Sequence, residues 1–290
     1  MYQVRVLREP TILVLAEQQL KIDGLKGFVR YLKDQGGCGI AQDSPADQHP
    51  VEVLFRHGGR REVSGQLPEL LTDNEMLCEV AGRKCYNSFG EKIGHSANDD
   101  YIANILGAPG KIPHASVLYH AKMTFFFAGI SRRMTHELIR HYVGADRSEE
   151  GCPSQESTRY TEHPGHFVAH PRILDSGAQL IAFEDDMTVA YSQYRRYVDD
   201  SVLAHESVHG VGPKGMDRKR IYEAAASYLP GCASTSMVWT TNPVALQKIF
   251  FERCDEAADL EFQRFAKLLR GICHDRWPNL FRESNPAAAR

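Results

Sequence analysis

Two neighbouring segments of this chain concentrate side chains that bind anions. ELIRHY, residues 137–142, offers a carboxylate, a guanidinium and an imidazole, and SQESTRY, residues 154–160, ends in a Ser-x-Arg-Tyr sequence. Arginine is suited to planar, bidentate recognition of phosphate and carboxylate groups. The two segments therefore predict a site for a small anionic molecule, and a nucleotide is the favoured class. From the charges alone, a solvated and charged helix face is an equally good interpretation.

The spacing around the first segment favours a binding site. A helix through this region places four polar side chains on one stripe, namely Arg133, Glu137, Arg140 and His141. Met134 and Leu138 form an adjacent apolar stripe that can pack on a core. The preceding run MTFFFAGIS, residues 123–131, is typical of a buried strand. A rigid strand that leads into a helix would hold the polar side chains in fixed positions.

The composition is that of a globular enzyme. The chain has 290 residues, of which 42% are apolar and 24% charged, with a net charge of -3. This balance argues against binding to nucleic acid polymers or membrane surfaces, which requires a basic excess. No apolar run reaches membrane-spanning length, and MYQVRVLREP at the start lacks a signal-peptide core. Seven cysteines without a CxxC spacing predict no disulfide framework, and therefore a cytoplasmic location.

The elements that must position these residues are helices and short strands in irregular order, which predicts an α+β fold around one core. Residues 1–68 are expected to form an N-terminal α/β segment packed on a main domain at 69–290. Strands are predicted over VRVL, TILVLA and VEVLF in that segment, with one helix at 24–34. The main domain is expected to contain a tyrosine-rich helix near 183–204, a strand at 235–241 and one long helix from Pro243 to Arg270.

One alternative comes from a different class of protein. HESVH, which contains His205, Glu206 and His209, matches the HExxH pattern of zinc peptidases. Gly210 follows at once and would end the helix, and Gly215 stands where the extended pattern has a third histidine. We therefore expect no metal site. No GxGxxG sequence follows a predicted strand, as a dinucleotide-binding fingerprint requires, and no phosphate-binding Walker A sequence is present.

Seven segments, taken in order, resemble the flavin-dependent thymidylate synthases, the ThyX family. They are AGRKCYNSFG, HASVLYH, ISRRMTHELIRHY, SQESTRY, EAAASYLP, TTNPVAL and FFERCDEAADLEF, and the likeness covers about residues 70–282. The resemblance implies the ThyX-like α+β domain in a homotetramer, with sites between subunits. It also implies reductive methylation of dUMP to dTMP, with FAD as cofactor, methylenetetrahydrofolate as carbon donor and NADPH as reductant. The cofactors carry the chemistry, so no protein nucleophile is required.

Matching positions imply a role for each candidate residue. Arg253 would be catalytic, facing the pyrimidine and favouring its N3-deprotonated form. FAD would contact Ser116, Arg140, His141, Tyr142, Gln155, Asn242 and Lys248. The nucleotide would contact Glu137, Arg140, Gln155, Glu156, Ser157, Thr158, Arg159 and Arg253, with Arg159 near the phosphate.

This chain departs from the family pattern at several polar positions. The family pattern has Glu at the position of Tyr119, and Arg at the positions of Tyr142, Ala226 and Val244. Lys248 stands where Asn or His is usual. The segment 143–156 is longer than its counterpart in the family. Each lost hydrogen bond to a charged group costs about 1.5–3 kcal/mol, so substitutes are expected among Arg147, Lys214, Arg218, Lys219 and Arg220. The second interpretation is accordingly a diverged paralogue, which acts on another pyrimidine nucleotide or has weak activity.

Overall fold

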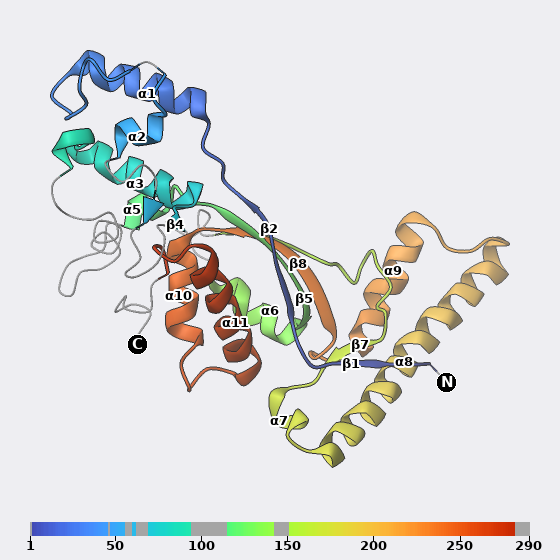
Figure 1. Cartoon of the computed structure of the whole chain (residues 1–290). Coiled ribbons are helices and arrows are strands. Elements are labelled where there is room, and N and C mark those ends of the chain that lie inside the picture. Colours follow the sequence, from blue (N-terminus) through green and yellow to red (C-terminus); the bar gives the residue numbers. More distant parts are fainter. Residues whose placement is uncertain are drawn as a thin grey trace.

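The computed structural model describes residues 2–45, 47–55, 60–61, 69–93, 115–141 and 151–281. Its centre is a four-stranded antiparallel sheet in the order β2-β5-β8-β6 (Figure 1). The strands are β2 (Thr11–Glu17), β5 (Met123–Ser131), β8 (Ser234–Thr241) and β6 (Gly151–Gln155). A second, parallel pair joins β1 (Arg5–Leu7) to β7 (His166–Val168), and a short antiparallel pair joins β3 (Arg60–Arg61) to β4 (Glu69–Leu70).

Strand β5 lies between β2 and β8, and its apolar residues point alternately to the two faces of the sheet. Phe125 and Phe127 are fully buried on the inner face. The alternation is interrupted between Phe127 and Ile130, where the pairing with β8 shifts register. Gly129 lies in this bulge with a φ of 67°, and a Cβ there would lie 2.9 Å from the carbonyl oxygen of Glu9. The position therefore requires glycine.

Two C-terminal helices cover the inner face of the sheet. They are α10 (Pro243–Arg253) and α11 (Leu260–Arg276), and their apolar residues share one cluster with the buried residues of β5 and β8. The prediction of one long helix is therefore wrong. The chain breaks between them because Asp259 caps α11, accepting hydrogen bonds from the backbone N–H groups of Glu261 (3.1 Å) and Phe262 (3.4 Å).

The N-terminal helices form a second cluster of buried residues. Helices α1 (Ile22–Gln35) and α2 (Pro50–Leu54) pack there with Met76 and Val80 of α3 (Asp73–Tyr86). The strand predicted over VEVLF is wrong, because Pro50 at the first helical position starts α2 instead. Strand β2 belongs to the central sheet, so residues before 68 contribute to two parts of the fold. The domain boundary near residue 68 stays a prediction.

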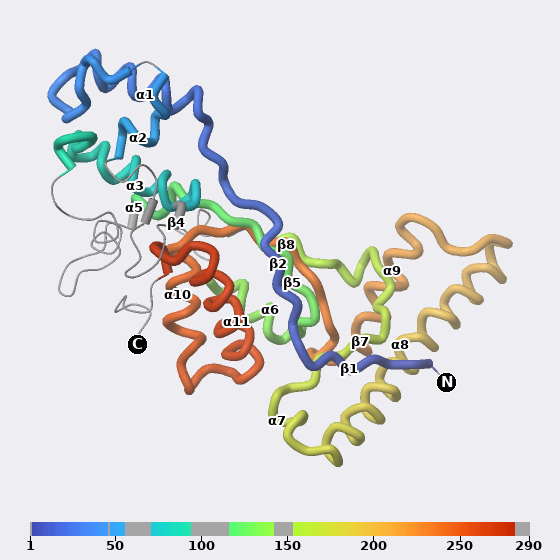
Figure 2. Tube along the Cα trace, viewed as in Figure 1, coloured from blue at the N-terminus to red at the C-terminus, as the bar shows by residue number. Residues whose placement is uncertain are grey.

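A third cluster lies under the longest helix. Helix α8 (Gly177–His209) packs against α9 (Gly215–Ala225) and the short η3 (Ala226–Tyr228), and Figure 2 shows α8 and α9 projecting beside the sheet. The short elements α5 (Ala115–Leu118), α6 (Arg132–Leu138), η1 (Gly90–Lys92), η2 (Ile139–His141) and α7 (Pro171–Leu174) complete the described chain. The α+β class is confirmed, although the buried residues form three clusters instead of one core. Within the described ranges, no helix has the length and apolar character needed to cross a membrane.

Candidate functional site

Arg253, at the end of α10, is the centre of a polar cluster. Its Nη1 donates to Oε2 of Glu137 in α6 at 3.0 Å, and its Nε donates to Nε2 of His141 in η2 at 3.2 Å. The guanidinium also lies 5.0 Å from the ring centroid of Phe262 in α11. Two residues of the predicted stripe, Glu137 and His141, therefore meet the predicted catalytic arginine. Phe262 is a part of this cluster that sequence reasoning missed.

The remaining donors of Arg253 define what the cluster can bind. A guanidinium has five N–H groups, and these two contacts use two of them. Within the part of the chain that the structure describes, the other three make no hydrogen bond to protein. A His141 ring that accepts at Nε2 carries its proton on Nδ1 in the neutral form. Within the described residues, the cluster therefore holds a guanidinium with three N–H groups left to donate to a planar, anionic acceptor.

Arg133 does not join this cluster, although the sequence placed it on the same stripe. Its Nη1 pairs with Oδ2 of Asp259 at 2.7 Å and its Nη2 with Oε2 of Glu261 at 3.1 Å. Burial raises the pKa of Asp259, but the hydrogen bonds and charge of Arg133 outweigh this and leave that pKa below its usual range. Ser131 also donates to Glu261, at 2.7 Å. Arg133 therefore fastens the start of α6 to the start of α11.

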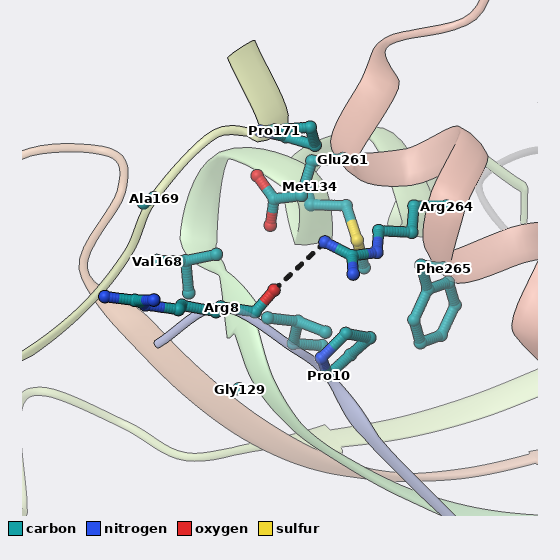
Figure 3. Close-up of a pocket in the computed structure, with 11 residues that line it drawn as sticks. Arg8, Pro10, Gly129, Met134, Val168, Ala169, Pro171, Glu261, Arg264 and Phe265 are labelled. Atoms are coloured by element: carbon teal, nitrogen blue, oxygen red, sulfur yellow. Dashed lines mark hydrogen bonds between the residues drawn. The ribbon is translucent and has the colours of Figure 1, made fainter. Parts of the chain in front are cut away.

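A small pocket opens beside the ion pairs that Arg133 makes with Asp259 and Glu261. Arg8, Gly129, Glu261, Arg264 and Phe265 are among the residues that line it, and Arg264 donates to the carbonyl oxygen of Arg8 at 3.2 Å (Figure 3). The predicted site residues are not among those that line this pocket. It therefore adds nothing to the candidate site.

The SQESTRY segment is held at the other end of α6. Gln155 donates to the hydroxyl oxygens of Thr135 and Thr235, both at 3.2 Å. The carbonyl oxygen of Glu156 accepts from Arg132 at 2.8 Å. Thr158 is half-buried in the loop that follows.

Arg159 extends from that loop to another element. Its Nε pairs with the carboxylate of Glu223 in α9, and its backbone N–H donates to the hydroxyl of Ser157 at 3.3 Å. Arg159 thus pairs with a residue of α9, whereas Arg253 belongs to α10 and pairs with Glu137. Helices α9 and α10 lie well apart in Figure 1. Glu223 is a second partner that sequence reasoning missed, since nothing in the sequence relates it to the loop.

Several of the residues predicted to contact FAD lie on α10 or on elements that contact it, whereas Gln155 lies on β6. Ser116 is exposed on α5 and Arg140 is exposed in η2, and both elements contact α10. Lys248 is half-buried on α10 itself. Asn242 is fully buried and caps α10, since its Oδ1 accepts from the backbone N–H of Ala245 at 3.0 Å. Tyr142 and the insert residue Arg147 lie outside the described residues.

Two departures from the family pattern have a structural consequence. Val244 lies in the first turn of α10 and packs against the cluster under the sheet. Ala226 begins η3, directly after α9. Val244 therefore makes an apolar contact where the family pattern has an arginine, and Ala226 places a small side chain where the pattern has another.

The zinc-peptidase alternative finds no support in the geometry. Helix α8 ends at His209, and Gly210 closes it in the left-handed conformation with a φ of 71°. Nδ1 of His205 lies 3.0 Å from the carbonyl oxygen of Val211, and its Nε2 lies 3.6 Å from Asp217. Among the residues described, no group of three or more His, Cys, Asp or Glu side chains could hold a metal ion.

Comparison with known proteins gives a consistent result. A family model described as thymidylate synthase complementing protein matches residues 66–279. A flavin-dependent thymidylate synthase of Corynebacterium diphtheriae is 29% identical over 76% of this chain and 82% of its own length. One from Mycobacterium sp. (strain JLS) is 33% identical over 66% of this chain and 72% of its own. The structure of a UMP/dUMP methylase, PolB from Streptomyces cacaoi bound with 5-Br UMP, shares the fold, with a TM-score of 0.57, 14% identity, and coverage of 96% of this chain and 95% of that one.

Proposed function

The chain belongs to the thymidylate synthase complementing protein family, and from that membership we propose that it is a flavin-dependent thymidylate synthase. It would convert dUMP to dTMP by reductive methylation, with methylenetetrahydrofolate as carbon donor and NADPH as reductant. The single observation that carries the proposal, beyond the family, is the Arg253 cluster. Its guanidinium contacts Glu137 and His141 and has three further N–H groups that make no hydrogen bond within the described residues.

Arg253 would act on the pyrimidine ring. A guanidinium fixed beside the ring stabilises negative charge as it develops, and fixing it in advance avoids the cost of reorientation during the reaction. Glu137 and His141 would hold that orientation as well as contact the ligands. Arg140, Gln155, Glu156, Ser157 and Thr158 would complete the nucleotide contacts, with Arg159 at the phosphate.

FAD would be held around α10. Ser116 and Arg140 offer an exposed hydroxyl and an exposed guanidinium there, which are suitable partners for the polar and anionic parts of a flavin nucleotide. His141 and Lys248 add a ring nitrogen and an ammonium group, and Tyr142, Gln155 and Asn242 complete the proposed set. When bound and reduced by NADPH, the flavin would supply the hydride that completes the methyl group, and the protein would orient and polarise the reactants.

We further propose that the active form is a homotetramer in the cytoplasm. Arg159 pairs with Glu223 of α9, whereas Arg253 pairs with Glu137 of α6, and this separation supports a site to which more than one copy contributes. Nucleic acid polymers and membranes are not among the proposed partners, because the net charge is slightly negative.

An anaerobic assay with FAD, NADPH, methylenetetrahydrofolate and dUMP tests the function. We expect the purified chain to bind added FAD and to form dTMP only when all four compounds are present. UMP in place of dUMP separates the proposed synthase from a paralogue with another pyrimidine substrate. A chain that methylates UMP but not dUMP in this assay would refute the dUMP assignment. A chain that binds no FAD at high micromolar concentration would refute the flavoenzyme assignment.

A further inference from the structure

Two cations lie against the exposed ring of Tyr160. The guanidinium carbon of Arg159 lies 6.0 Å from the ring centroid, and Nζ of Lys219 lies 5.1 Å from it. Tyr160 and Arg159 belong to the SQESTRY loop, whereas Lys219 belongs to α9. The aromatic ring thus holds an ammonium group from one element beside a guanidinium from another, through attraction of both cations to its face.

The two cations differ in their anionic partners. Arg159 pairs with Glu223, which follows Lys219 by four residues and so lies on the same face of α9. Lys219 is half-buried, and its ammonium group makes no hydrogen bond or ion pair within the described residues. One carboxylate therefore serves a pair of neighbouring positive charges, and the pair has a net positive charge.

The other basic residues of α9 are arranged differently. Nε of Arg218 donates to the hydroxyl of Tyr222 at 2.9 Å, and that hydroxyl lies 3.3 Å from Glu162, so Arg218 belongs to a separate network. Arg220 is exposed, and its place on the helix is rotated by about 100° from that of Lys219. Lys219 is thus the basic residue of α9 that contacts the loop containing Arg159 without an anionic partner of its own.

We propose that Lys219 is a second phosphate-binding residue beside Arg159, and that Glu223 occupies the guanidinium of Arg159 when no nucleotide is bound. The inference rests on the nucleotide role proposed above for the loop. A carboxylate and a phosphate both accept from the same fork of N–H groups. A phosphate monoester carries close to two negative charges near neutral pH, so two cations match it better than one. The ligand class is a nucleoside 5′-monophosphate.

The exposure of the pair explains how a phosphate displaces Glu223. The side chains of Arg159 and Glu223 are 52% and 37% exposed. Exposed ion pairs are weak, so competition from Glu223 lowers phosphate affinity by at most about fivefold. Removing the competing charge should therefore strengthen nucleotide binding, whereas removing the charge of Lys219 should weaken it. These opposite signs distinguish the proposal from general loss of folding.

The test measures the dissociation constant of dUMP by calorimetry with the full, FAD-loaded chain. We expect Lys219→Ala to raise the constant by about tenfold, Lys219→Arg to restore most of the affinity, and Glu223→Gln to lower the constant by about two- to fivefold. Arg220→Ala removes the same charge from the adjacent position on the helix and should stay within about twofold of the wild type. Melting temperatures and flavin absorbance should be unchanged in all four variants.

Each contrary result has a definite meaning. If Lys219→Ala behaves like Arg220→Ala, Lys219 does not bind phosphate. If Glu223→Gln weakens dUMP binding, Glu223 orients Arg159 and does not compete with the ligand. A wild type that does not bind dUMP overturns both this proposal and the proposed nucleotide site. A wild type that binds dUMP but forms no dTMP overturns only the synthase activity, and the comparison of Lys219 variants still applies.

Discussion

Arg253 is the residue on which the proposed chemistry depends most. Replacing Arg253 with Ala removes the positive charge at the pyrimidine, so tritium release from labelled dUMP should fall by about 10²–10³-fold. Arg253→Lys keeps the charge without the planar fork and should retain part of the activity. The melting temperature and flavin absorbance of both variants should stay close to those of the wild type.

A matched control for Arg253 is available at Arg172. This arginine is 78% exposed, so Arg172→Ala should leave turnover unchanged. Full turnover in Arg253→Ala would remove this residue from the site. It would also remove the main structural support for the synthase assignment.

His163 makes folding stability depend on pH. Its side chain is buried among Phe167, Tyr191 and Tyr194. Burial, assisted by the charge of Arg132, lowers its pKa from 6.5 to about 4. The unfolded chain therefore binds a proton at a higher pH than the folded chain. Stability from this residue is present above pH 6.5 and is lost as pH falls towards 4, by about 3 kcal/mol in total.

Urea unfolding between pH 7.5 and 4.5 measures this effect. The wild type should lose more stability over that range than His163→Asn, whose amide cannot take up the proton. His136→Gln replaces an exposed histidine and should follow the wild type. Parallel pH dependence in the wild type and His163→Asn would show that another group is responsible.

At single positions, the sequence was informative about residue type and less so about partners. Glu137 in α6 and His141 in η2 belong to the stripe that their spacing predicted, and both contact Arg253. The pairing of Arg133 with Asp259 does not, because it depends on how α6 meets α11 in space. The same holds for Glu223, which reaches Arg159 only after α9 packs beside the loop.

The contact between two loops at the N-terminal cluster requires glycine on both sides. A Cβ on Gly39 would lie 2.3 Å from the carbonyl oxygen of Phe89, and one on Gly90 would lie 2.5 Å from that of Gly39. Both glycines have positive φ values. Gly39→Ala should therefore destabilise the protein by more than about 1 kcal/mol, from strain as well as from the clash.

The control for this contact is a glycine in α1. Gly27 has no heavy atom within 4 Å of an added Cβ, so Gly27→Ala should stabilise the protein by about 0.5–1 kcal/mol. Thermal unfolding of both variants gives the comparison. If both substitutions change the melting temperature in the same direction, the loop contact does not contribute as described.

Among the elements, those with a strong local pattern were predictable and those set by packing were not. Strands β5 and β8 were expected from their apolar runs and are present. The VEVLF segment has an alternating pattern but forms α2, in which Val51, Val53 and Leu54 are all buried. The break before α11 had a signal that was missed, because Asp259 followed by an apolar residue and Glu261 is typical of a helix start.

At the level of the whole molecule, one face of the central sheet has an apolar row that crosses three strands. Leu13 of β2 pairs with Phe126 of β5, which pairs with Val238 of β8. Leu13 is 50% exposed and Val238 is 37% exposed. In the proposed homotetramer we expect a second copy to cover this row, because exposed apolar rows of this kind mark contact surfaces.

Sedimentation velocity tests the assembly. The wild type should sediment as a tetramer, and Leu13→Glu should shift it towards smaller species because a charge would be buried in the contact. Ile181→Glu changes another exposed apolar residue, far from the sheet on α8, and should leave the mass unchanged. A wild type that sediments as a monomer would contradict the proposed homotetramer.

The pairing of β1 and β2 has a consequence for biosynthesis. These strands leave the ribosome before their partners, because β2 pairs with β5, β1 pairs with β7, and Glu17 binds Arg276 and Trp277 near the end of α11. Until β5 has been made, β2 remains an unpaired strand in the nascent chain, with Leu13 and Leu15 uncovered. Such long-range pairing slows folding and favours aggregation. The sheet can therefore close only after β8 has been made, and until then a chaperone that binds extended apolar segments would protect the chain.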